Sequence, residues 1–403
     1  MNGPGNQIGR VEVTYKAVTP MFCGGAQPST AELRLPSFKG VLRWWWRALA
    51  FSRLGGNLER IAKEEEEMFG SARHGRGKVA MRLLESSSLR PIPKGEVLKP
   101  GSEVIGEGAR YLGYGVMEAF DRRPREGRPG ASAGQLTRGC LLAPFALKVE
   151  LRVRSLDSDR LEMLLDALRA LGVLGGLGAK SRKGYGSLVL QSLLLDGASR
   201  WSPPATLEDL QVAIRQLMER HGGAALPPYT ALSDRTRVVL VGGDRKDSAP
   251  ALLDRVGREM VRYRSWGHEG RVLGRPREGN FKADHDLMKQ PPAQRTNHPV
   301  RIAFGLPHNY GSKPHEQVGA PGVDRRASPL LIHLHECGGA PVAAVSLFPA
   351  RFLPGGDAAQ IDVGGASVRI KPDPELWKPV HAFLDRLLTE PRERFSAAVE
   401  VRP

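Results

Sequence analysis

Alternating apolar and charged residues mark the clearest strand of the chain. Between residues 146 and 155 every second residue is apolar and those between them are charged, the pattern of a strand with one buried side. Apolar residues spaced three and four apart predict helices that bury one face. In the first half these patterns predict strands over 11–22, 79–84, 146–155 and 187–195, and helices over 37–52, 58–69 and 161–171. The acidic run at 64–67 is expected to be the solvated side of the second helix.

The second half repeats this order approximately. The patterns predict strands over 238–243, 301–307, 328–336, 342–348 and 395–401, and helices over 251–264 and 375–388. The order strand, helix, strand, strand, helix, strand is that of the ferredoxin-like split βαβ unit, which RRM domains share. The predicted fold class is therefore α+β, with two ferredoxin-like (RRM-like) domains, loop insertions and a glycine-rich loop.

Proline and glycine place the domain boundary. Pro203 and Pro204, followed by the GGAALPP stretch at 222–228, interrupt the periodic pattern. We expect an N-terminal domain over 1–200 and a C-terminal domain over 201–403. The first contains an insertion at about 91–140, rich in Gly, Pro and Arg, whose length indicates a functional or mobile segment. Residues 265–299 are expected to form a basic, irregular loop.

The charge balance narrows the class of partner. The chain has 403 residues, with 59 Lys and Arg against 43 Asp and Glu, a formal charge of +16. Such an excess favours a polyanionic partner. The 41% hydrophobic content excludes wholesale disorder. We expect neither a signal peptide nor a membrane span, and a cytoplasmic location.

Candidate metal ligands are few. Cys23, Cys140 and Cys337 lie far apart without a CxxC pair, so neither a disulfide framework nor a zinc site is expected. His333 and His335 share one face of a strand, but no further ligand has a recognisable spacing, and a structural role is favoured. No metal and no cofactor is predicted.

The glycine loop, which we define as residues 175–187 (GGLGAKSRKGYGS), invites a nucleotide-binding interpretation. A P-loop is excluded because Ala179 replaces the last glycine and the loop follows a helix. Ser181 likewise breaks a GxGxxG pattern. What remains is a backbone able to approach a phosphate, or simply a tight turn with solvated lysines. The RNA-binding candidates here are Gly176, Gly178, Lys180, Arg182, Lys183, Gly184 and Tyr185, the last as a stacking surface.

The helix at 37–52 carries a second candidate set. Lys39, Arg43 and Arg47 recur every four residues and form one cationic stripe that could follow a nucleic-acid backbone. The alternative is ordinary snorkelling at a domain surface. Consecutive tryptophans at 44–46 cannot all face the core, so at least one should lie at the surface or an interface. His74, in a basic loop, is a further candidate phosphate contact.

These motifs together resemble a known family. The segments TPMFCGGAQPSTAELRLPSFKGVLRWWWRAL, EEEEMFGSARHGRGKV and GGLGAKSRKGYGSLVL resemble the RAMP superfamily of CRISPR effector subunits. The PSxKGxLRxWWRA-like helix with the FGS turn is similar to one branch, the first Cmr subunit of type III-B complexes. NFKADHDLM, FGLPHNYG, DRRASPLLIHLHE and ARFLP also resemble the long form of that branch.

The resemblance implies a place at the head of a ribonucleoprotein, near the 3′ part of the guide RNA and the paired target RNA, among other Cmr subunits. It implies RNA contacts at Lys39, Arg43, Arg47, Lys180, Arg182 and Lys183. Subunits of such complexes that cut RNA carry an aspartate between the first strand and the first helix. Here residues 24–36 contain Glu32 as their only acid, so we expect RNA binding without cleavage.

Two other functions stay open. One is a RAMP-type, metal-independent endoribonuclease that processes guide precursors with His74 or His285 as the base. A histidine lying against the glycine loop would favour it. The other is a protein scaffold whose charge merely assists assembly, which affinity for free RNA would exclude.

Overall fold

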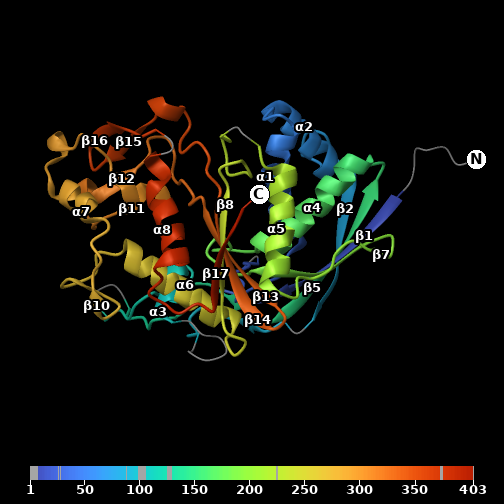
Figure 1. The fold of residues 1–403 in the computed structure, drawn as a ribbon, viewed down its shortest axis with the longest axis horizontal. Helices are drawn as coiled ribbons and strands as arrows, with labels where there is room; N and C mark the ends of the chain where they lie inside the picture. Colours follow the sequence, from blue (N-terminus) through green and yellow to red (C-terminus); the bar gives the residue numbers. More distant parts are fainter. Residues whose placement is uncertain are drawn as a thin grey trace, which may run out of the picture.

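Four layers, sheet, helices, sheet and helices, make up the fold of the computed structural model (Figure 1). The structure describes residues 8–25, 27, 29–87, 89–98, 106–124, 129–223, 226–372 and 375–402. None of the helices in these ranges has both the length and the apolarity to cross a membrane. The mixed α/β class with antiparallel sheets is confirmed.

The first sheet has one buried and one polar side. Its antiparallel strands are ordered β2 (Val79–Ser87), β5 (Phe145–Arg154), β1 (Ile8–Ala17), β6 (Leu188–Leu195) and β7 (Ala198–Ser199). Apolar side chains such as Val13 and Val149, opposite each other in the register, face the core. Helices α1 (Leu35–Arg53), α2 (Leu58–Phe69) and α4 (Ser158–Leu174) pack on this side.

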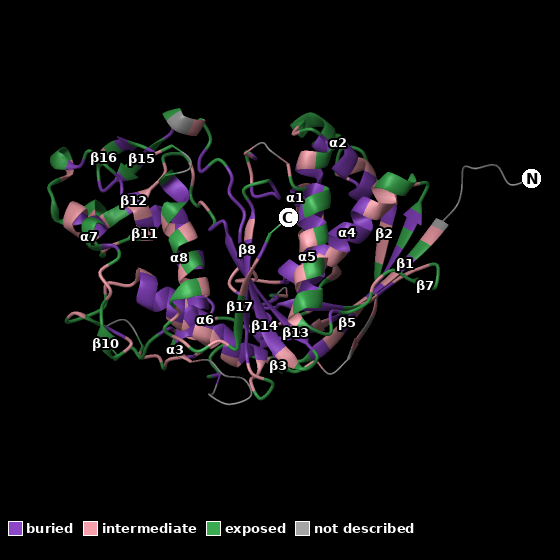
Figure 2. Cartoon of the chain, in the orientation of Figure 1, coloured by how far each residue is buried: buried purple, intermediate pink, exposed green. Residues whose placement is uncertain are grey.

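The second sheet is apolar on both sides. Its order is β13 (Leu330–Cys337), β14 (Ala340–Leu347), β8 (Arg237–Gly242) and β17 (Ala397–Val401). On β8, Val238 and Leu240 join the core of the first half, whereas Val239 and Val241 join a second core. Helices α4 and α5 (Leu207–His221) cover one side, and α6 (Ala249–Arg264) and α8 (Lys378–Thr389) the other. Figure 2 shows β8 and β14 buried between the two helical layers, whereas the outer strand β17 is partly exposed.

The two sheets share one strand order. In each, the first strand lies between the third and the fourth, and the second strand lies beyond the third. The second sheet thus repeats the strand order of the first. Predicted bounds match within a few residues for most elements, and the helix over 58–69 coincides with α2.

Three elements differ from the prediction. Residues 300–304, expected in a strand, form a 3-10 helix, η2 (Val300–Phe304), because the Asp284 carboxylate accepts hydrogen bonds from the backbone N–H groups of its first two residues. Helix α5 was not expected, although Thr206 and Asp209 form a capping box at its start. The basic loop at 265–299 contains β9 (Arg271–Val272), β10 (Arg275–Pro276), α7 (Lys282–Lys289) and η1 (Pro292–Gln294).

The short elements complete the two halves. A peripheral sheet in the second half pairs β11 (His308–Asn309), β12 (Gln317–Gly319), β15 (Gln360–Val363) and β16 (Ala366–Arg369). The 3-10 helices η3 (Pro314–Glu316), η4 (Gly356–Ala358) and η5 (Glu375–Trp377) connect longer elements. Cys23, Cys140 and Cys337 are buried.

The described parts of the insertion pack against the rest of the protein. Strand β3 (Pro91–Ile92) pairs with β4 (Cys140–Leu141), and helix α3 (Glu107–Leu112) lies on α6. The helices approach so closely that a Cβ on Gly108 would lie 2.1 Å from the Asp254 carbonyl oxygen. The Ala109 N–H donates to the Asp254 carboxylate at 2.9 Å. Helix α3 therefore joins the first half to the second.

The glycine loop is a second joint between the halves. The Ile332 N–H donates to the Arg182 carbonyl at 3.0 Å, and the Leu334 N–H donates to the Ser187 hydroxyl at 3.0 Å. His333 Nδ1 lies 2.6 Å from the Gly175 carbonyl oxygen. The loop thus runs along the edge strand β13 of the second sheet.

The glycines of this loop approach protein atoms. At Gly178, with φ +95°, a Cβ would lie 2.8 Å from the Phe22 carbonyl oxygen, and at Gly176 it would lie 2.8 Å from that of Gly186. At Gly184, with φ +84°, it would meet Leu253 and Leu334. We predicted that these glycines allow close approach of a phosphate; the structure corrects this, because the space each missing Cβ leaves is filled by protein.

Gly178→Val is therefore expected to destabilise the whole chain rather than only RNA binding. Backbone strain and overpacking together should lower the free energy of unfolding by about 3 kcal/mol. Gly115→Val is the matched control, because Gly115 has φ +90° and no atom within 4 Å of its Cβ position. Strain alone should cost about 1 kcal/mol there. Urea unfolding measures both variants, and equal losses would contradict the role of the joint.

Candidate nucleic-acid interface

Helix α1 positions the predicted cations beside the tryptophans. Trp45 and Trp46 are buried in the core, whereas Trp44 is half-buried. The Trp44 ring packs edge-on against Trp45, with 4.9 Å between the ring centroids. As the spacing predicts, one of the three rings therefore reaches the surface.

Two cations of the predicted stripe are paired with an acid. Arg43 Nε and Arg47 Nη1 each lie 2.6 Å from the same Glu65 oxygen of helix α2. Glu65 is buried, as is its neighbour Glu64. This corrects the expectation that the acidic run is solvated, and it shows that Arg43 and Arg47 do not form a free cationic stripe. Both residues help to hold α1 against α2.

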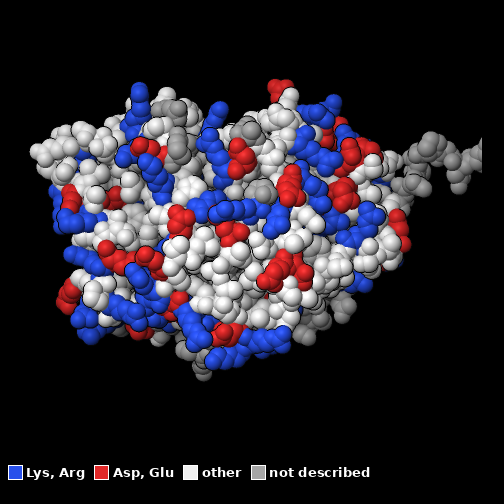
Figure 3. All heavy atoms as spheres, in the orientation of Figure 1, with Lys and Arg blue, Asp and Glu red and all other residues white. Residues whose placement is uncertain are grey.

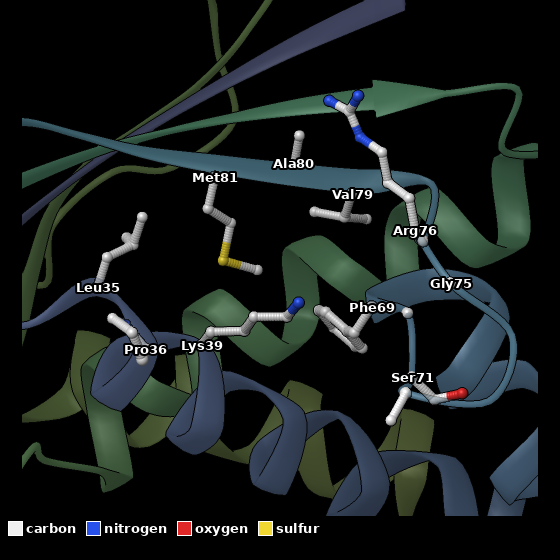
Figure 4. Close-up of a pocket in the computed structure, with 13 residues that line it drawn as sticks. Leu35, Pro36, Lys39, Phe69, Ser71, Gly75, Arg76, Val79, Ala80 and Met81 are labelled. Carbon is white, nitrogen blue, oxygen red and sulfur yellow. The ribbon is translucent and has the colours of Figure 1, made fainter.

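Lys39 lies apart from them, in a hollow of about 640 Å³ between α1 and β2. Figure 4 shows its side chain extending across this hollow toward Phe69, whereas the Arg76 guanidinium points away. His74 is not among the residues that line the hollow. Its ring is 67% exposed, and Nδ1 lies 2.6 Å from a Glu66 oxygen. The structure thus does not bring Lys39 and His74 together with the glycine loop.

Tyr185 is unavailable for stacking. Its ring is completely buried, and its hydroxyl donates to the Ala109 carbonyl at 2.7 Å. Burial raises the pKa of this hydroxyl strongly, and the nearby Asp254 carboxylate raises it further. The prediction of a base-stacking surface at Tyr185 is wrong, because the ring fastens the insertion to the loop.

The cations of the loop diverge into two hollows. Arg182 faces the first, of about 540 Å³, which we call the Trp44 groove. Lys180 and Lys183 face the second, of about 990 Å³, which we call the Lys183 cavity. The two share no lining residue. The Trp44 groove is lined chiefly by Trp44, Arg47, Arg182, Tyr229, Arg326, Arg351 and Phe352.

The Trp44 groove combines aromatic surface with uncompensated positive charge. The Arg182 guanidinium lies 5.1 Å from the Trp44 ring centroid, and that of Arg326 lies 5.6 Å from the Phe352 ring. Their hydrogen bonds go to backbone carbonyls, those of Ser328, Phe352 and Ala327. Within the described residues, no carboxylate pairs with either guanidinium.

Burial makes these arginines unusually costly to keep charged. It lowers the pKa of Arg182, and together with the Arg182 charge it lowers the pKa of Arg326 to about 10. Arg326 remains cationic at neutral pH because this value lies well above 7. An anion placed between them would relieve the repulsion and regain the charge-assisted hydrogen bonds.

The histidines do not form a metal site in the described part of the chain, where no group of three His, Cys, Asp or Glu side chains could hold an ion. His333 and His335 are buried within the second sheet. His285 stacks on Trp266 with 4.4 Å between the rings, and burial with nearby Arg301 lowers its pKa to about 4. His308, which we had not singled out, lines the Lys183 cavity beside Lys183.

Sequence reasoning missed the contribution of the second half to the groove. Arg326, Arg351 and Phe352 come from connections at the ends of the second sheet. They lie within DRRASPLLIHLHE and ARFLP, segments that carried the family resemblance without an assigned role. These two segments are the part of the sequence from which the contribution of the second half to the groove could have been predicted.

The excess of positive charge is not gathered in one continuous patch on the side of the molecule shown in Figure 3. Lysine and arginine are interspersed there with aspartate and glutamate over most of the surface. Uncompensated cations in hollows, rather than total charge, therefore single out a binding surface.

Comparisons with known proteins agree on one family. The model of the RAMP superfamily matches residues 14–189. The CRISPR system Cmr subunit Cmr1-2 of Pyrococcus furiosus is 30% identical over 182 residues, 44% of this chain and 93% of that protein. The CRISPR system Cmr subunit Cmr1-1 of the same organism is 24% identical over 274 residues, 65% of this chain and 75% of that protein.

A solved structure extends the likeness to the whole fold. The crystal structure of Cmr1 from Pyrococcus furiosus in its apo form matches with a TM-score of 0.54 and 18% identity, covering 98% of each chain. At that identity the match concerns the fold alone.

Arg43→Ala combined with Arg47→Ala should destabilise the chain by about 3 kcal/mol, because it leaves the Glu65 carboxylate buried without its partners. Adding Glu65→Leu should restore most of the loss, since removing the whole cluster leaves no unpaired charge. Lys39→Ala, on the same helix, should change stability by less than about 0.5 kcal/mol. Thermal and urea unfolding measure all three, and an unchanged double variant would disprove the structural role.

Proposed function

The chain belongs to the RAMP superfamily, among its Cmr1-type subunits, and from this premise we propose that it is a non-catalytic RNA-binding subunit of a type III-B CRISPR (Cmr) ribonucleoprotein. Its partners are other Cmr subunits, the 3′ part of the guide RNA and the target RNA. The observation that carries the proposal is the Trp44 groove, where Arg182 and Arg326 lie beside aromatic rings and form no ion pair within the described ranges.

This groove suits a single RNA strand. Arginines attract phosphates and release their counterions, and an accessible aromatic ring can stack on any unpaired base. Trp44 and Arg182 come from the first half, and Arg326 and Phe352 from the second. RNA in the groove would therefore touch both halves at their junction. Lys39, His74 and Lys180 lie outside this groove and are proposed as separate contacts.

We infer that each half is a ferredoxin-like domain, one over 1–200 and the other over 201–403. The shared strand order and the position of the helices support this inference. The domains are not independent, because α5 of the second packs on α1 and α4 of the first.

The endoribonuclease alternative receives little support from the histidines it names. His74 Nδ1 lies 2.6 Å from a Glu66 oxygen in an exposed turn, and His285 is stacked against Trp266. Neither lies against the glycine loop. His333 does, but it is buried and its Nδ1 lies against the Gly175 carbonyl. We therefore propose binding without cleavage.

Arg182→Ala combined with Arg326→Ala tests the groove. Affinity of the full chain for a labelled single-stranded RNA should fall about tenfold at moderate salt, and the salt slope should decrease by up to about two phosphate contacts. Lys282→Ala with Lys378→Ala is the control, since it removes the same charge from side chains that are 68% and 71% exposed. Fluorescence anisotropy at several salt concentrations measures both. Equal losses in the two variants would show that only total charge matters.

The purified chain should leave guide precursors and target RNA intact, with or without divalent metal. We expect no cleavage product on denaturing gels, because the segment between first strand and first helix has Glu32 as its only acid. Cleavage that disappeared in His74→Ala, His285→Ala or His308→Ala would establish the endoribonuclease instead. A nuclease contaminant would be unaffected by these substitutions.

A further inference from the structure

The Lys183 cavity is built by three separate parts of the chain. The insertion contributes Tyr111, Tyr114 and Phe120, and the glycine loop contributes Lys180 and Lys183. The second half contributes Arg264, Trp266, Arg271, Arg301 and His308. Its volume of about 990 Å³ lies at the upper end of the range for ligand sites in proteins.

Lys183 places an unpaired cation in this cavity. Its ammonium nitrogen is buried and has no hydrogen-bond partner among the described residues. Burial lowers its pKa to about 7, helped by the positive charges of Arg264, Lys180 and Arg182. A buried ammonium without a partner is destabilising and loses its proton more easily, and an anion bound beside it would favour the charged form.

Neighbouring basic side chains also have buried nitrogens that lack hydrogen-bond partners. Nε of Arg264 and Nε of Arg301 are buried without hydrogen-bond partners in the described ranges, as is Nε2 of His308. The Arg264 guanidinium lies 4.4 Å from the Phe304 ring, and that of Arg301 lies 4.9 Å from the Phe281 ring. These phenyl rings cannot replace a carboxylate as hydrogen-bond acceptors for the two guanidinium groups.

The nearby acids are already engaged. Glu107 lines the cavity but lies 3.4 Å from the Arg258 guanidinium, in an ion pair. Asp284 accepts the backbone N–H groups of Val300 and Arg301 and the Tyr310 hydroxyl. The positive charge of the cavity is therefore left for a ligand.

Aromatic side chains accompany this charge. Tyr114 and Phe120 are each 70% exposed, among the largest exposures of hydrophobic residues in the described chain. Such exposure suits contact with a partner. Trp266 lies beneath the Arg277 guanidinium, 3.7 Å from the ring centroid. Cations next to accessible rings are the combination that binds phosphates and unpaired bases together.

We propose that the Lys183 cavity holds a phosphate of single-stranded RNA, with Lys183 as its buried anchor, and that Tyr114 and Phe120 stack on adjacent unpaired bases. The inference rests on the proposed RNA-binding function and adds a second, separate contact to it. It also gives the insertion a role, because α3 and its docking on α6 place these rings at the cavity.

Lys183→Met tests the anchor in the full chain with a labelled single-stranded oligoribonucleotide. Affinity should fall about tenfold, the loss expected for one charge-assisted hydrogen bond. The melting temperature should stay the same or rise, because the substitution removes an unpaired buried charge. Lys282→Met, at a 68% exposed side chain, should change neither quantity appreciably.

The pH dependence provides a second measurement. Arg264 of α6, Lys180, Arg301 of η2, His308 of β11 and the acid Glu107 line the cavity with Lys183, and Arg182 of the loop acts on its ammonium by charge although its side chain faces the other hollow. RNA favours protonated Lys183, so affinity should fall as the pH rises through about 7, where the free protein loses this proton. Lys183→Met should lack this component.

Tyr114→Ala with Phe120→Ala tests the rings. The double variant should weaken binding of single-stranded RNA and leave binding of an RNA duplex nearly unchanged, because paired bases cannot stack on the rings. Unchanged affinity for single strands, together with loss of assembly with other Cmr subunits, would mean that the rings dock protein, and would overturn the stacking.

The outcomes separate the two proposals. If the wild-type chain binds RNA and Lys183→Met binds it equally well, the cavity is not a phosphate site, whereas the proposed function stands. If the wild-type chain binds no RNA at any salt concentration, the proposed function fails first. Weaker binding by Lys183→Met with an unaltered melting temperature supports the anchor, because a folding defect is then excluded.

Discussion

Burial of the second sheet on both sides is the constraint on which the rest of the structure depends. One face of this sheet packs against a helix of the other half, α4, so both faces need apolar residues. Strand β8 has them in Val238, Val239 and Leu240. Helix α4 must then be apolar on two sides as well, and it is buried along nearly all of its last three turns. The halves consequently cannot separate without exposing a core, and they act as one body.

This layered core determines where unpaired cations can lie. Charged groups buried within the layers are paired, as Asp166 of α4 is with Arg169 and Arg220, whereas the unpaired cations described above lie at the edges of the layers, where loops close them. The glycine loop lies at such an edge, beside β13. Arg182 lies in a turn and Lys183 in the bridge to Ile332, and their side chains face different hollows. One short segment thereby serves two surfaces.

The sequence pattern was sufficient for elements with local causes. The alternation over β5 and the spacing in α2 depend on side chains within each element, and both were predicted closely. Helix α5 had equally local signals, with Thr206 at its start and Leu210, Ile214 and Leu217 on one face, and could have been predicted. The predictions that were wrong concern residues whose partners lie far away in the sequence. Nothing near Arg43 indicates that Glu65 will be its partner, and nothing within the loop indicates that Gly178 lies against Phe22.

The identity of distant partners also separates cations with a structural role from cations that are candidates for ligand binding. Sequence alone does not distinguish Arg43 and Arg47 from Arg182, since all three are candidate RNA contacts there. In the fold, however, the first two share Glu65, whereas Arg182 meets only carbonyl and ring partners. A buried acid makes a cation part of the scaffold, and its absence leaves charge that a ligand must balance. Because Arg182 and Lys183 are adjacent in the chain, a single RNA strand bound across the loop would neutralise both hollows, and each would then favour the other by fixing the path of the strand.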